Sequence, residues 1–394
     1  MARLIDITGK CVSGEWGSDD NDGTGIRVLR TTNFTNEGLV NFNNVVTRQI
    51  NKNNLDEKYL RNGDIIIEKS GGSDNQPVGR VVYFEEQENM YLFNNFTGLL
   101  RVKDQTKWLP KYIFYALFAN YQKGGTRPFE NKTTGLHNLK TDRYVSSMEI
   151  KERSFDEQKK IVNEIDTICS LIYTRKKQLS KLDELVKARF VELFGNVENK
   201  ISIGEMCNVT GGYSFKSGDI SNDGAIKILQ IGNVYLDNVS WETTNFLPEG
   251  YDKKYSKFML NEGDIIVALT RPIIQSLGNV KACIVKSSDL PCLLNQRVGR
   301  IVAKNEKTVF LEFIYGCLMT DDFTRYVESC SIGCSQPNIS TKDIENYLIP
   351  NATYEEQKAY VELKKQTDKS KFEVQQSLEK LETLKKSLMQ QYFG

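Results

Sequence analysis

The chain has 394 residues, which is too long for one ordinary hydrophobic core, so length alone predicts two or three domains. Hydrophobic residues make up 39% and charged residues 26% of the chain, values that exclude a disordered or fibrous protein. The net charge of +1 does not by itself indicate a nucleic-acid binder, because such proteins often carry a basic excess.

The chain shows neither a transmembrane span nor a signal peptide. No run of some twenty apolar residues occurs, and the first residues lack the apolar core of a secretory signal. Its eight cysteines are scattered and form no C-x-x-C pair. We therefore expect a cytoplasmic protein with reduced thiols.

Residues 1–150 alternate short apolar runs with clusters of Gly, Asn and Asp, a pattern typical of β-strands joined by loops. The predicted strands cover residues 26–29, 64–68, 78–84 and 99–102. Residues 112–119 are predicted to form a helix, and residues 123–135 a polar loop that leads through Leu139 toward a long helix. From Arg101 to Arg143 nine basic residues face three acidic ones, a local excess of +6.

Residues 155–195 are predicted to form one long helix. Apolar residues recur at alternating steps of four and three, which places them on one stripe with a near-heptad spacing. Ser154 and Asp156 can cap the start of this helix, and Gly195 can end it. An apolar stripe of this length needs a partner.

The second half of the chain repeats the first. Residues 201–350 follow the same order at an offset of 200, and residues 354–394 repeat the long helix at an offset of 199. The repeated pairs include Gly63-Asp64-Ile65-Ile66 with Gly263-Asp264-Ile265-Ile266, Asn95 with Asn295, Asn138 with Asn338, Gln158 with Gln357, and Phe194-Gly195 with Phe393-Gly394. The loops after the G-D-I-I strand differ, which is expected if each half binds a different version of one kind of ligand.

The repeat predicts the architecture. The fold class is α/β (α+β), with two tandem globular domains, each followed by a long helix, and the two helices form an antiparallel coiled coil with pseudo-two-fold symmetry. The predicted segments are residues 1–153, 154–196, 197–352 and 353–394. Each helix of about 40 residues would span about 60 Å. Lys364, Lys371 and Lys385 stand where apolar residues are expected, so the N-terminal half of the second helix is predicted to pack loosely.

This chain resembles the specificity (S) subunits of type I restriction-modification systems over its whole length. The resemblance rests on the tandem order, on the G-D-I-I strand before a polar loop in each half, and on L-x-N-x-x segments at 92–96 and 293–297. It also rests on the helix starts Glu157-Gln158-Lys159 and Glu356-Gln357-Lys358. Each motif is weak alone, but the set occurs twice in the same order.

The resemblance implies that the two globular units are target recognition domains and that the helices separate them. Such a subunit reads a bipartite, asymmetric sequence of double-stranded DNA. Two methyltransferase (modification) subunits would dock on the helices, and restriction subunits can join. S-adenosylmethionine and ATP would then be bound by partner subunits, with no cofactor, metal or membrane for this chain.

The sequence offers little support for an enzyme. No Asn/Asp-Pro-Pro-aromatic run, Gly-rich cofactor loop or G-x-x-x-x-G-K-[ST] phosphate loop occurs. His137 is the only histidine, which excludes a site that needs several imidazoles. Asp64 with Glu68-Lys69 resembles a nuclease motif in part, but its spacing is wrong, and we interpret Asp64 as a turn residue that leads its strand.

DNA recognition requires cations for phosphates and amide or guanidinium groups for base edges. The loops supply these groups, and for each residue a solvated surface role is the alternative; for His137 that alternative is a surface or capping role. The candidates are Lys69, Ser70, Arg80, Lys123, Arg127, His137 and Lys140 in the first half, and Lys216, Thr270, Arg271, Gln275, Arg297, Gln336 and Asn338 in the second.

Two further groups and one rival function remain open. Trp16, Tyr213 and Phe215 either pack in the core or contact sugar and base surfaces. Asn95 and Asn295 are assigned to structural hydrogen bonds. The rival hypothesis is a coiled-coil interaction scaffold whose duplicated domains bind protein or carbohydrate.

Overall fold

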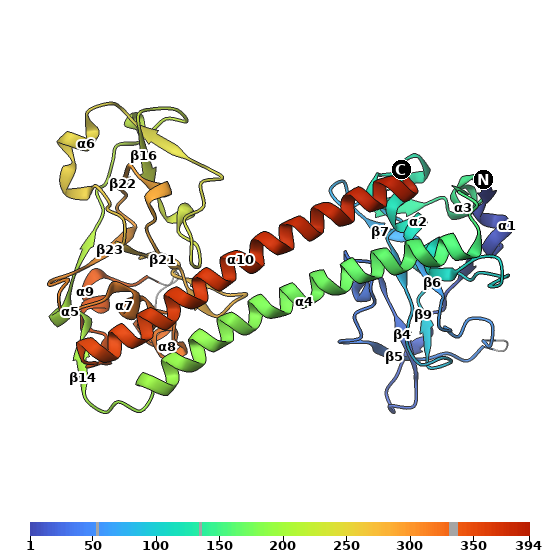
Figure 1. Cartoon of the computed structure of the whole chain (residues 1–394), viewed down its shortest axis with the longest axis horizontal. Coiled ribbons are helices and arrows are strands. Elements are labelled where there is room, and N and C mark those ends of the chain that lie inside the picture. Colours follow the sequence, from blue (N-terminus) through green and yellow to red (C-terminus); the bar gives the residue numbers. More distant parts are fainter. Residues whose placement is uncertain (53–54, 134–135, 331–337) are drawn as a thin grey trace. The chain divides into compact units, whose positions relative to one another are not determined.

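The computed structural model describes residues 1–52, 55–133, 136–330 and 338–394. The chain forms two compact units: the first contains Met1–Lys177 and Gln375–Gly394, and the second contains Gln178–Val374. Both long helices, α4 (Phe155–Phe194) and α10 (Tyr354–Phe393), run without interruption from one unit into the other (Figure 1). Their bounds fall inside the predicted segments 154–196 and 353–394.

The first unit contains short strands and three short helices besides its share of the long ones. Its helices are α1 (Leu4–Thr8), α2 (Pro110–Gln122) and α3 (Thr141–Ser147). Its strands are β1 (Ala2–Arg3), β2 (Val12–Ser13), β3 (Ser18–Asp19), β4 (Ile26–Leu29), β5 (Val46–Gln49), β6 (Ile65–Glu68), β7 (Ser70–Gly72), β8 (Val81–Tyr83), β9 (Tyr91–Phe93), β10 (Thr97–Leu100), β11 (Glu130–Thr133), β12 (Leu136–Leu139) and β13 (Glu149–Ile150).

The second unit repeats this plan. Its helices are α5 (Ile203–Met206), α6 (Tyr251–Lys254), α7 (Leu311–Leu318), α8 (Asp321–Cys330) and α9 (Thr341–Asn346). Its strands are β14 (Lys200–Ser202), β15 (Cys207–Gly211), β16 (Ile226–Leu229), β17 (Asn245–Leu247), β18 (Ile265–Ala268), β19 (Ile273–Ile274), β20 (Asn279–Val280), β21 (Ala282–Ile284), β22 (Cys292–Leu294), β23 (Val298–Ala303) and β24 (Leu348–Pro350).

The G-D-I-I motif forms the central strand of a four-stranded antiparallel sheet in each unit. The strand order is β2-β10-β6-β8 in the first unit and β15-β23-β18-β21 in the second. Side chains alternate between the two faces of a strand. Ile65 and Ile67 accordingly pack in a core with α2 and α4, whereas Ile66 packs in a second core with Leu29 and Phe34. The strand is therefore apolar throughout because both of its faces are buried.

The Asp residues of the repeat are structural. The Asp64 carboxylate accepts the backbone N–H of Arg61 at 2.7 Å, and the Asp264 carboxylate accepts that of Asn261 at 2.9 Å. This confirms Asp64 as the residue that turns the chain into its strand.

The two halves are related by an offset of 201, not 200, around Asn295. The N–H of Asn94 donates to the carbonyl of Leu29, and that of Asn295 donates to the carbonyl of Leu229. Asn94, which is 4% exposed, is therefore the equivalent of Asn295, while Asn95 is exposed. The assignment of Asn95 to a structural hydrogen bond was wrong because the first half has one residue fewer before this point.

The predicted polar loop 123–135 contains regular structure. A 3₁₀ turn at Arg127–Phe129 leads into β11, which pairs with β12, and β12 pairs with β7 in a three-stranded sheet. Helix α3 and β13 then separate Leu139 from α4. These partners are distant in sequence, so local composition did not reveal them.

The E-Q-K motifs fasten each long helix to its globular core. Ser154 and Glu157 form a reciprocal capping box, as do Thr353 and Glu356. These hydrogen bonds lower the pKa of Glu157. Ser154 is thus confirmed as a cap, whereas Asp156 is exposed and forms only an ion pair with Lys159 at 3.9 Å.

The glutamine of each motif is buried and bridges the helix to the preceding chain. The Gln158 amide accepts the Leu109 N–H at 2.8 Å and donates to the carbonyls of Lys107 and Arg153. Gln357 makes the same set of bonds to Phe310, Thr308 and Ala352.

Replacing Gln158 with alanine is expected to cost about 1–3 kcal/mol, because three partly buried backbone groups are left without their hydrogen-bond partner. Urea unfolding of the chain measures this cost. Gln376→Ala, at an exposed position of α10, is the matched control and should stay within about 0.5 kcal/mol of the unsubstituted chain. Equal effects of the two changes would contradict the bridging role.

The two long helices pack antiparallel, as predicted. In the first unit the end of α10 meets the start of α4, where Met389 lies in a core with Ile161 and Ile165. In the second unit the start of α10 meets the end of α4, where Tyr360 contacts Phe190 with ring centroids 5.2 Å apart.

The predicted loose packing of the N-terminal half of α10 was wrong. Tyr360 and Val361 are both 2% exposed. The lysines do not disturb this packing because Lys364 pairs with Asp368 at 2.7 Å and Lys371 pairs with Asp183. Their ammonium groups are therefore neutralised at the edge of the packed surface.

Candidate nucleic-acid interface

Several of the predicted residues lie near one place in each unit, the end of the central strand. The N–H of Leu139 donates to the carbonyl of Lys69 at 2.8 Å, and the N–H of Ile339 donates to the carbonyl of Leu269 at 2.9 Å. These bonds place Asn138 opposite Ser70 and Asn338 opposite Thr270. Both strand ends thus carry an asparagine opposite a hydroxyl residue, whereas the residues beside them differ, with Lys69 and Gly71 in the first unit and Leu269 and Arg271 in the second.

In the first unit a cavity of about 620 Å³ opens beside this strand end. Three predicted residues line it, namely Arg80, Lys123 and Arg127. They come from the loop before β8, the end of α2 and the 3₁₀ turn that follows it. Lys123 and Arg127 are exposed, and the ammonium group of Lys123 donates to the carbonyl of Phe393 at 2.8 Å.

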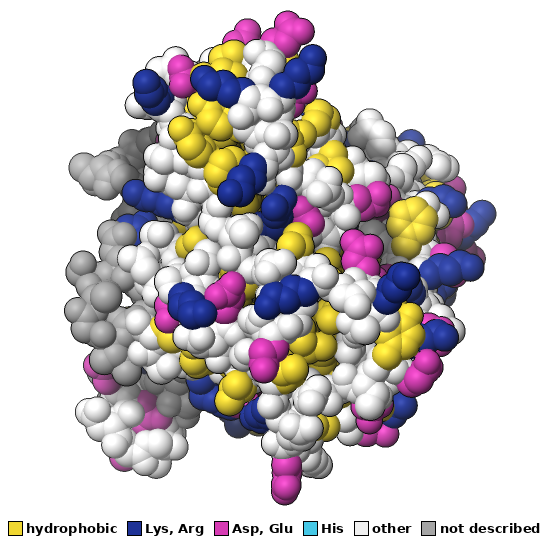
Figure 2. Space-filling view, turned by 90° about the vertical axis from the view of Figure 1, so that its left-hand side faces the viewer, with side chains coloured by type: hydrophobic (Ala, Val, Ile, Leu, Met, Phe, Trp, Pro, Cys, Tyr) yellow, Lys and Arg dark blue, Asp and Glu magenta, His cyan; other side chains and the backbone are white. Residues whose placement is uncertain are grey.

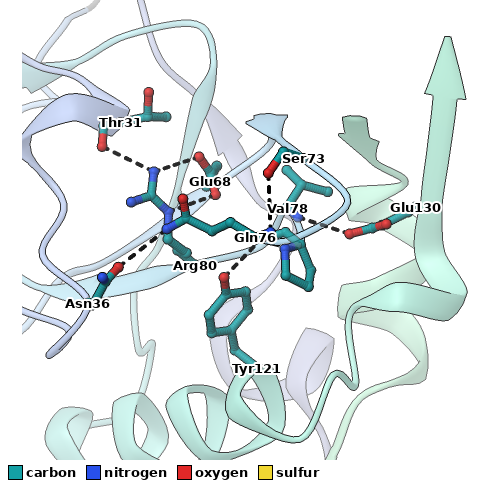
Figure 3. Close-up of polar contacts among 10 residues, drawn as sticks. Thr31, Asn36, Glu68, Ser73, Gln76, Val78, Arg80, Tyr121 and Glu130 are labelled. Carbon is teal, nitrogen blue, oxygen red and sulfur yellow. Dashed lines mark hydrogen bonds and ion pairs between the residues drawn. The ribbon is translucent and has the colours of Figure 1, made fainter. Parts of the chain in front are cut away.

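Arg80 is fixed by a buried carboxylate. Its guanidinium donates to both oxygens of Glu68, at 2.8 and 3.0 Å, and to the carbonyl of Thr31 at 3.2 Å (Figure 3). Glu68 is 1% exposed. Burial lowers the pKa of Arg80, but the hydrogen bonds and charge of Glu68 outweigh it, so the net shift is upward. Arg80 therefore stays charged and in place at the wall of the cavity.

Amide side chains line the same cavity, and they were not among the predicted residues. They are Asn36, Asn75, Gln76 and Gln122. The Gln76 amide donates to the Asn36 carbonyl oxygen at 3.3 Å, while the Tyr121 hydroxyl holds the loop through the carbonyl of Pro77 at 3.0 Å (Figure 3). Amides match the major-groove edge of adenine. For Gln76 and Gln122, the position in the sequence near the predicted cations Arg80 and Lys123 was the signal that could have found them.

His137 is buried, contrary to the surface or capping role weighed for it. Its ring lies 3.5 Å from a carboxylate oxygen of Glu130 and 3.8 Å from one of Asp74. Glu130 also accepts the N–H of Val78 (Figure 3). His137 thus supports the loop that borders the cavity, and its role as a DNA contact stays a prediction.

The other first-unit candidates lie close to the strand end or at its border. The Lys69 ammonium donates to the Ser13 hydroxyl, and the Ser70 hydroxyl donates to the side chain of Asn138, each at 2.6 Å. Lys140 is exposed at the residue before α3.

In the second unit four predicted residues meet at the end of β18. Thr270 bridges to Asn338, and the N–H of Leu269 donates to the carbonyl of Arg297 at 3.0 Å. Arg271 and Arg297 are exposed. Gln275 is exposed in the short hairpin of β19 and β20, and Gln336 lies outside the described residues.

Lys216 lies apart from this group, near a cluster of aromatic rings. Tyr255 and Phe258 both contact Tyr213 there, with ring centroids 4.6 and 5.3 Å from that of Tyr213. Lys254 lies 5.2 Å from the ring centroid of Tyr255. Figure 2 shows hydrophobic side chains at the top of this face, with basic and acidic side chains around them.

The aromatic candidates divide between core and surface. Phe215 is 7% exposed and packs in a core, whereas Tyr213 is 38% exposed. Trp16 packs against the core of Val28, Ile50 and Leu92 and is covered by Arg48.

The two carboxylates of the partial nuclease motif are each held by an arginine. Asp64 pairs with Arg101 at 2.6 Å, as Glu68 pairs with Arg80. No group of three or more His, Cys, Asp or Glu side chains suited to a metal ion is found in the described ranges. The described cysteines are all free thiols.

Comparison with known proteins shows that one family model matches both halves of the chain. A model of the type I restriction modification DNA specificity domain matches residues 4–184 and again residues 196–385. The MjaVIII specificity subunit of Methanocaldococcus jannaschii is 32% identical over 296 residues, which span 71% of this chain and 68% of that protein. The EcoAI specificity subunit of Escherichia coli is 30% identical over 163 residues, which span 39% of this chain and 26% of that protein.

Solved structures share the fold. The S subunit of a type I restriction-modification system from M. genitalium has a TM-score of 0.59 at 15% identity, over all of this chain and 95% of that one. A chain from a study of assembly and conformational transition of the type I system has a TM-score of 0.56 at 14% identity, over all of this chain and 96% of that one. The chain therefore belongs to the family of type I restriction-modification DNA specificity proteins.

Proposed function

We propose that this chain is a non-catalytic specificity subunit that reads a two-part, asymmetric sequence in double-stranded DNA. The observation that carries the proposal is the pair of equivalent strand ends, where a common frame holds different cations and amides. Guanidinium and amide groups recognise base edges, and lysine contacts phosphates. Different residues on the two frames would read two different half-sites.

The surfaces of the long helices support a scaffolding role. They expose large apolar side chains, namely Leu171, Tyr173, Leu185 and Val191 on α4, and Phe372 and Leu384 on α10. Two methyltransferase subunits would dock on these helices, and restriction subunits can join the complex. Methyl transfer and ATP hydrolysis would belong to those partners, which would bind S-adenosylmethionine and ATP. None of the described helices has the length and apolarity to cross a membrane.

Methylation-aware sequencing of the host genome tests the proposal. The expected result is one methylated motif made of two specified parts around a spacer of fixed length, which disappears when the gene for this chain is deleted. Binding of the chain to duplexes with this motif, with and without co-expressed methyltransferase, then measures its own contribution. Binding of protein or carbohydrate without any effect on methylation would favour the rival interaction scaffold.

The double variant Lys123→Ala/Arg127→Ala should weaken DNA binding by about eightfold at 0.1 M salt for each phosphate that it no longer binds. The slope of log affinity against log salt should become shallower by about 0.9 for each such phosphate. Filter binding of the chain with its methyltransferase partners, across a salt series, measures both quantities. Lys10→Ala removes an exposed lysine outside the cavity and serves as the control. An unchanged slope in the double variant would exclude phosphate binding at the cavity.

A further inference from the structure

Arg271 adopts a backbone conformation that its residue type disfavours. Its φ is +49°. In the described part of the chain the other non-glycine residues with positive φ are Asn44, Asn89 and Asp237. Asn and Asp enter this region most readily because their short polar side chains can bond locally, whereas a long side chain such as arginine gains no such compensation. Arg271 is therefore the residue whose strain needs another explanation.

The first unit shows what the turn itself requires. Ser70 pairs with Asn138 and Thr270 pairs with Asn338, so Arg271 and Gly71 hold the same position after the same strand end. Gly71 also has positive φ, at +124°. Glycine reaches positive φ without steric cost. Both units thus take positive φ at this position, although at different angles, and the second unit does so with an arginine.

The backbone around Arg271 is held on both sides. Thr270 bridges to Asn338 on one side, and on the other the carbonyl of Pro272 accepts the N–H of Lys281 at 2.6 Å. Pro272 is buried, while Arg271 itself is exposed. The strained residue is thus a fixed and accessible point on the surface, as is typical of residues that are positioned for contact.

We infer that Arg271 reads a guanine in the half-site recognised by the second unit, an inference that rests on the proposed function. The guanidinium fork matches the O6 and N7 acceptors of guanine in the major groove, and this bidentate contact needs a defined direction of approach. A phosphate can be contacted by a flexible cation from many directions, so it offers no reason for a strained backbone. A fixed backbone serves base reading because it removes alternative positions before binding.

Arg271→Gly separates the structural role from the reading role. The unfolding temperature of the chain should stay unchanged or rise by about 2 °C, because the strain is relieved. Methylation of the host genome by the variant should lose its preference for guanine at one position of one half-site, by about 5- to 150-fold. The other half-site should keep its sequence. A lower unfolding temperature together with an unchanged motif would show that Arg271 serves only the fold.

Arg271→Lys keeps the positive charge but lacks the two parallel donors of the guanidinium. This variant tests the inference if the Arg271→Gly chain supports no methylation at all. If Arg271 reads guanine, the lysine variant should methylate with relaxed preference at that same position. A lysine variant with both the preference and the methylation rate of the unsubstituted chain would overturn the inference, because an ammonium group cannot replace a bidentate fork without loss.

The first unit supplies the control. The variant Lys123→Ala/Arg127→Ala should lower methylation of the whole motif and leave the preference for guanine at the Arg271 position unchanged, because phosphate contacts carry no sequence information. If the unsubstituted chain specifies no two-part motif at all, the proposed function itself fails, and this outcome is visible before any variant is compared.

Discussion

Replacing Glu68 with alanine is expected to destabilise the first unit by about 3–5 kcal/mol. The substitution leaves the guanidinium of Arg80, whose side chain is 16% exposed, without its carboxylate partner. A partly buried charge without a partner costs more than the removal of one surface ion pair. Hydrogen exchange of the β6 and β8 amides during urea titration measures the destabilisation of this unit alone.

The second unit provides the matched control for this experiment. The N–H of Glu68 donates to the carbonyl of Arg80, and the N–H of Ala268 donates to that of Lys281. The double variant Glu68→Ala/Arg80→Lys therefore copies the residues that the second unit has at this place. It should recover most of the stability because a lysine can extend its ammonium group to water. A destabilisation of less than about 1 kcal/mol in the single variant would mean that Arg80 is effectively solvated.

Phe194→Ala should cost the second unit about 3–5 kcal/mol. The Phe194 ring is 2% exposed and lies among aromatic neighbours, with centroids 5.0 Å from Phe190 and 4.9 Å from Phe313. Its removal would leave a cavity that rigid rings cannot fill. Chemical unfolding followed by hydrogen exchange of α7 should show the destabilisation in the second unit.

The repeat again offers a control. Phe393 occupies the same place at the end of α10 but is only half-buried, with its ring 5.3 Å from that of Tyr112. Phe393→Ala should therefore cost about half as much or less, and in the first unit. An equal loss of stability in the two variants would mean that the apolar surface buried by each ring does not determine its contribution to stability.

The architecture could be predicted from the sequence because the chain contains two copies of the same pattern of elements. The strands that begin at Ile65 and Ile265 and the helices that begin after Ser154 and Thr353 depend on local patterns, such as apolar runs and caps. Agreement between two copies removed most of the ambiguity that a single copy would leave.

The errors arose where long-range pairing decides the structure. The hairpin of β11 and β12 forms because β7 is available to pair with it. The shift between Asn94 and Asn295 becomes visible only through their bonds to Leu29 and Leu229. His137 is buried with Glu130 beside its ring, although the segment before it is rich in polar residues.

The structure brings together candidate residues that come from separate loops of the sequence. Arg80, Lys123 and Arg127 were chosen from different segments, and the fold brings them to one cavity. The amides of Asn36 and Gln76 were missed because one of them belongs to a loop with no cation of its own. Only the folded structure shows which loops line the same cavity.

The burial of β6 and β18 on both faces constrains how the sequences of such proteins can evolve. A shift of either strand would disrupt two hydrophobic cores at once, so the position of the strand end is fixed. Residues in the loop after the strand can therefore be substituted without moving the strand, as Gly71 and Arg271 illustrate. Mutation and selection can then explore new DNA targets with little penalty in folding, and recognition can drift while the framework persists.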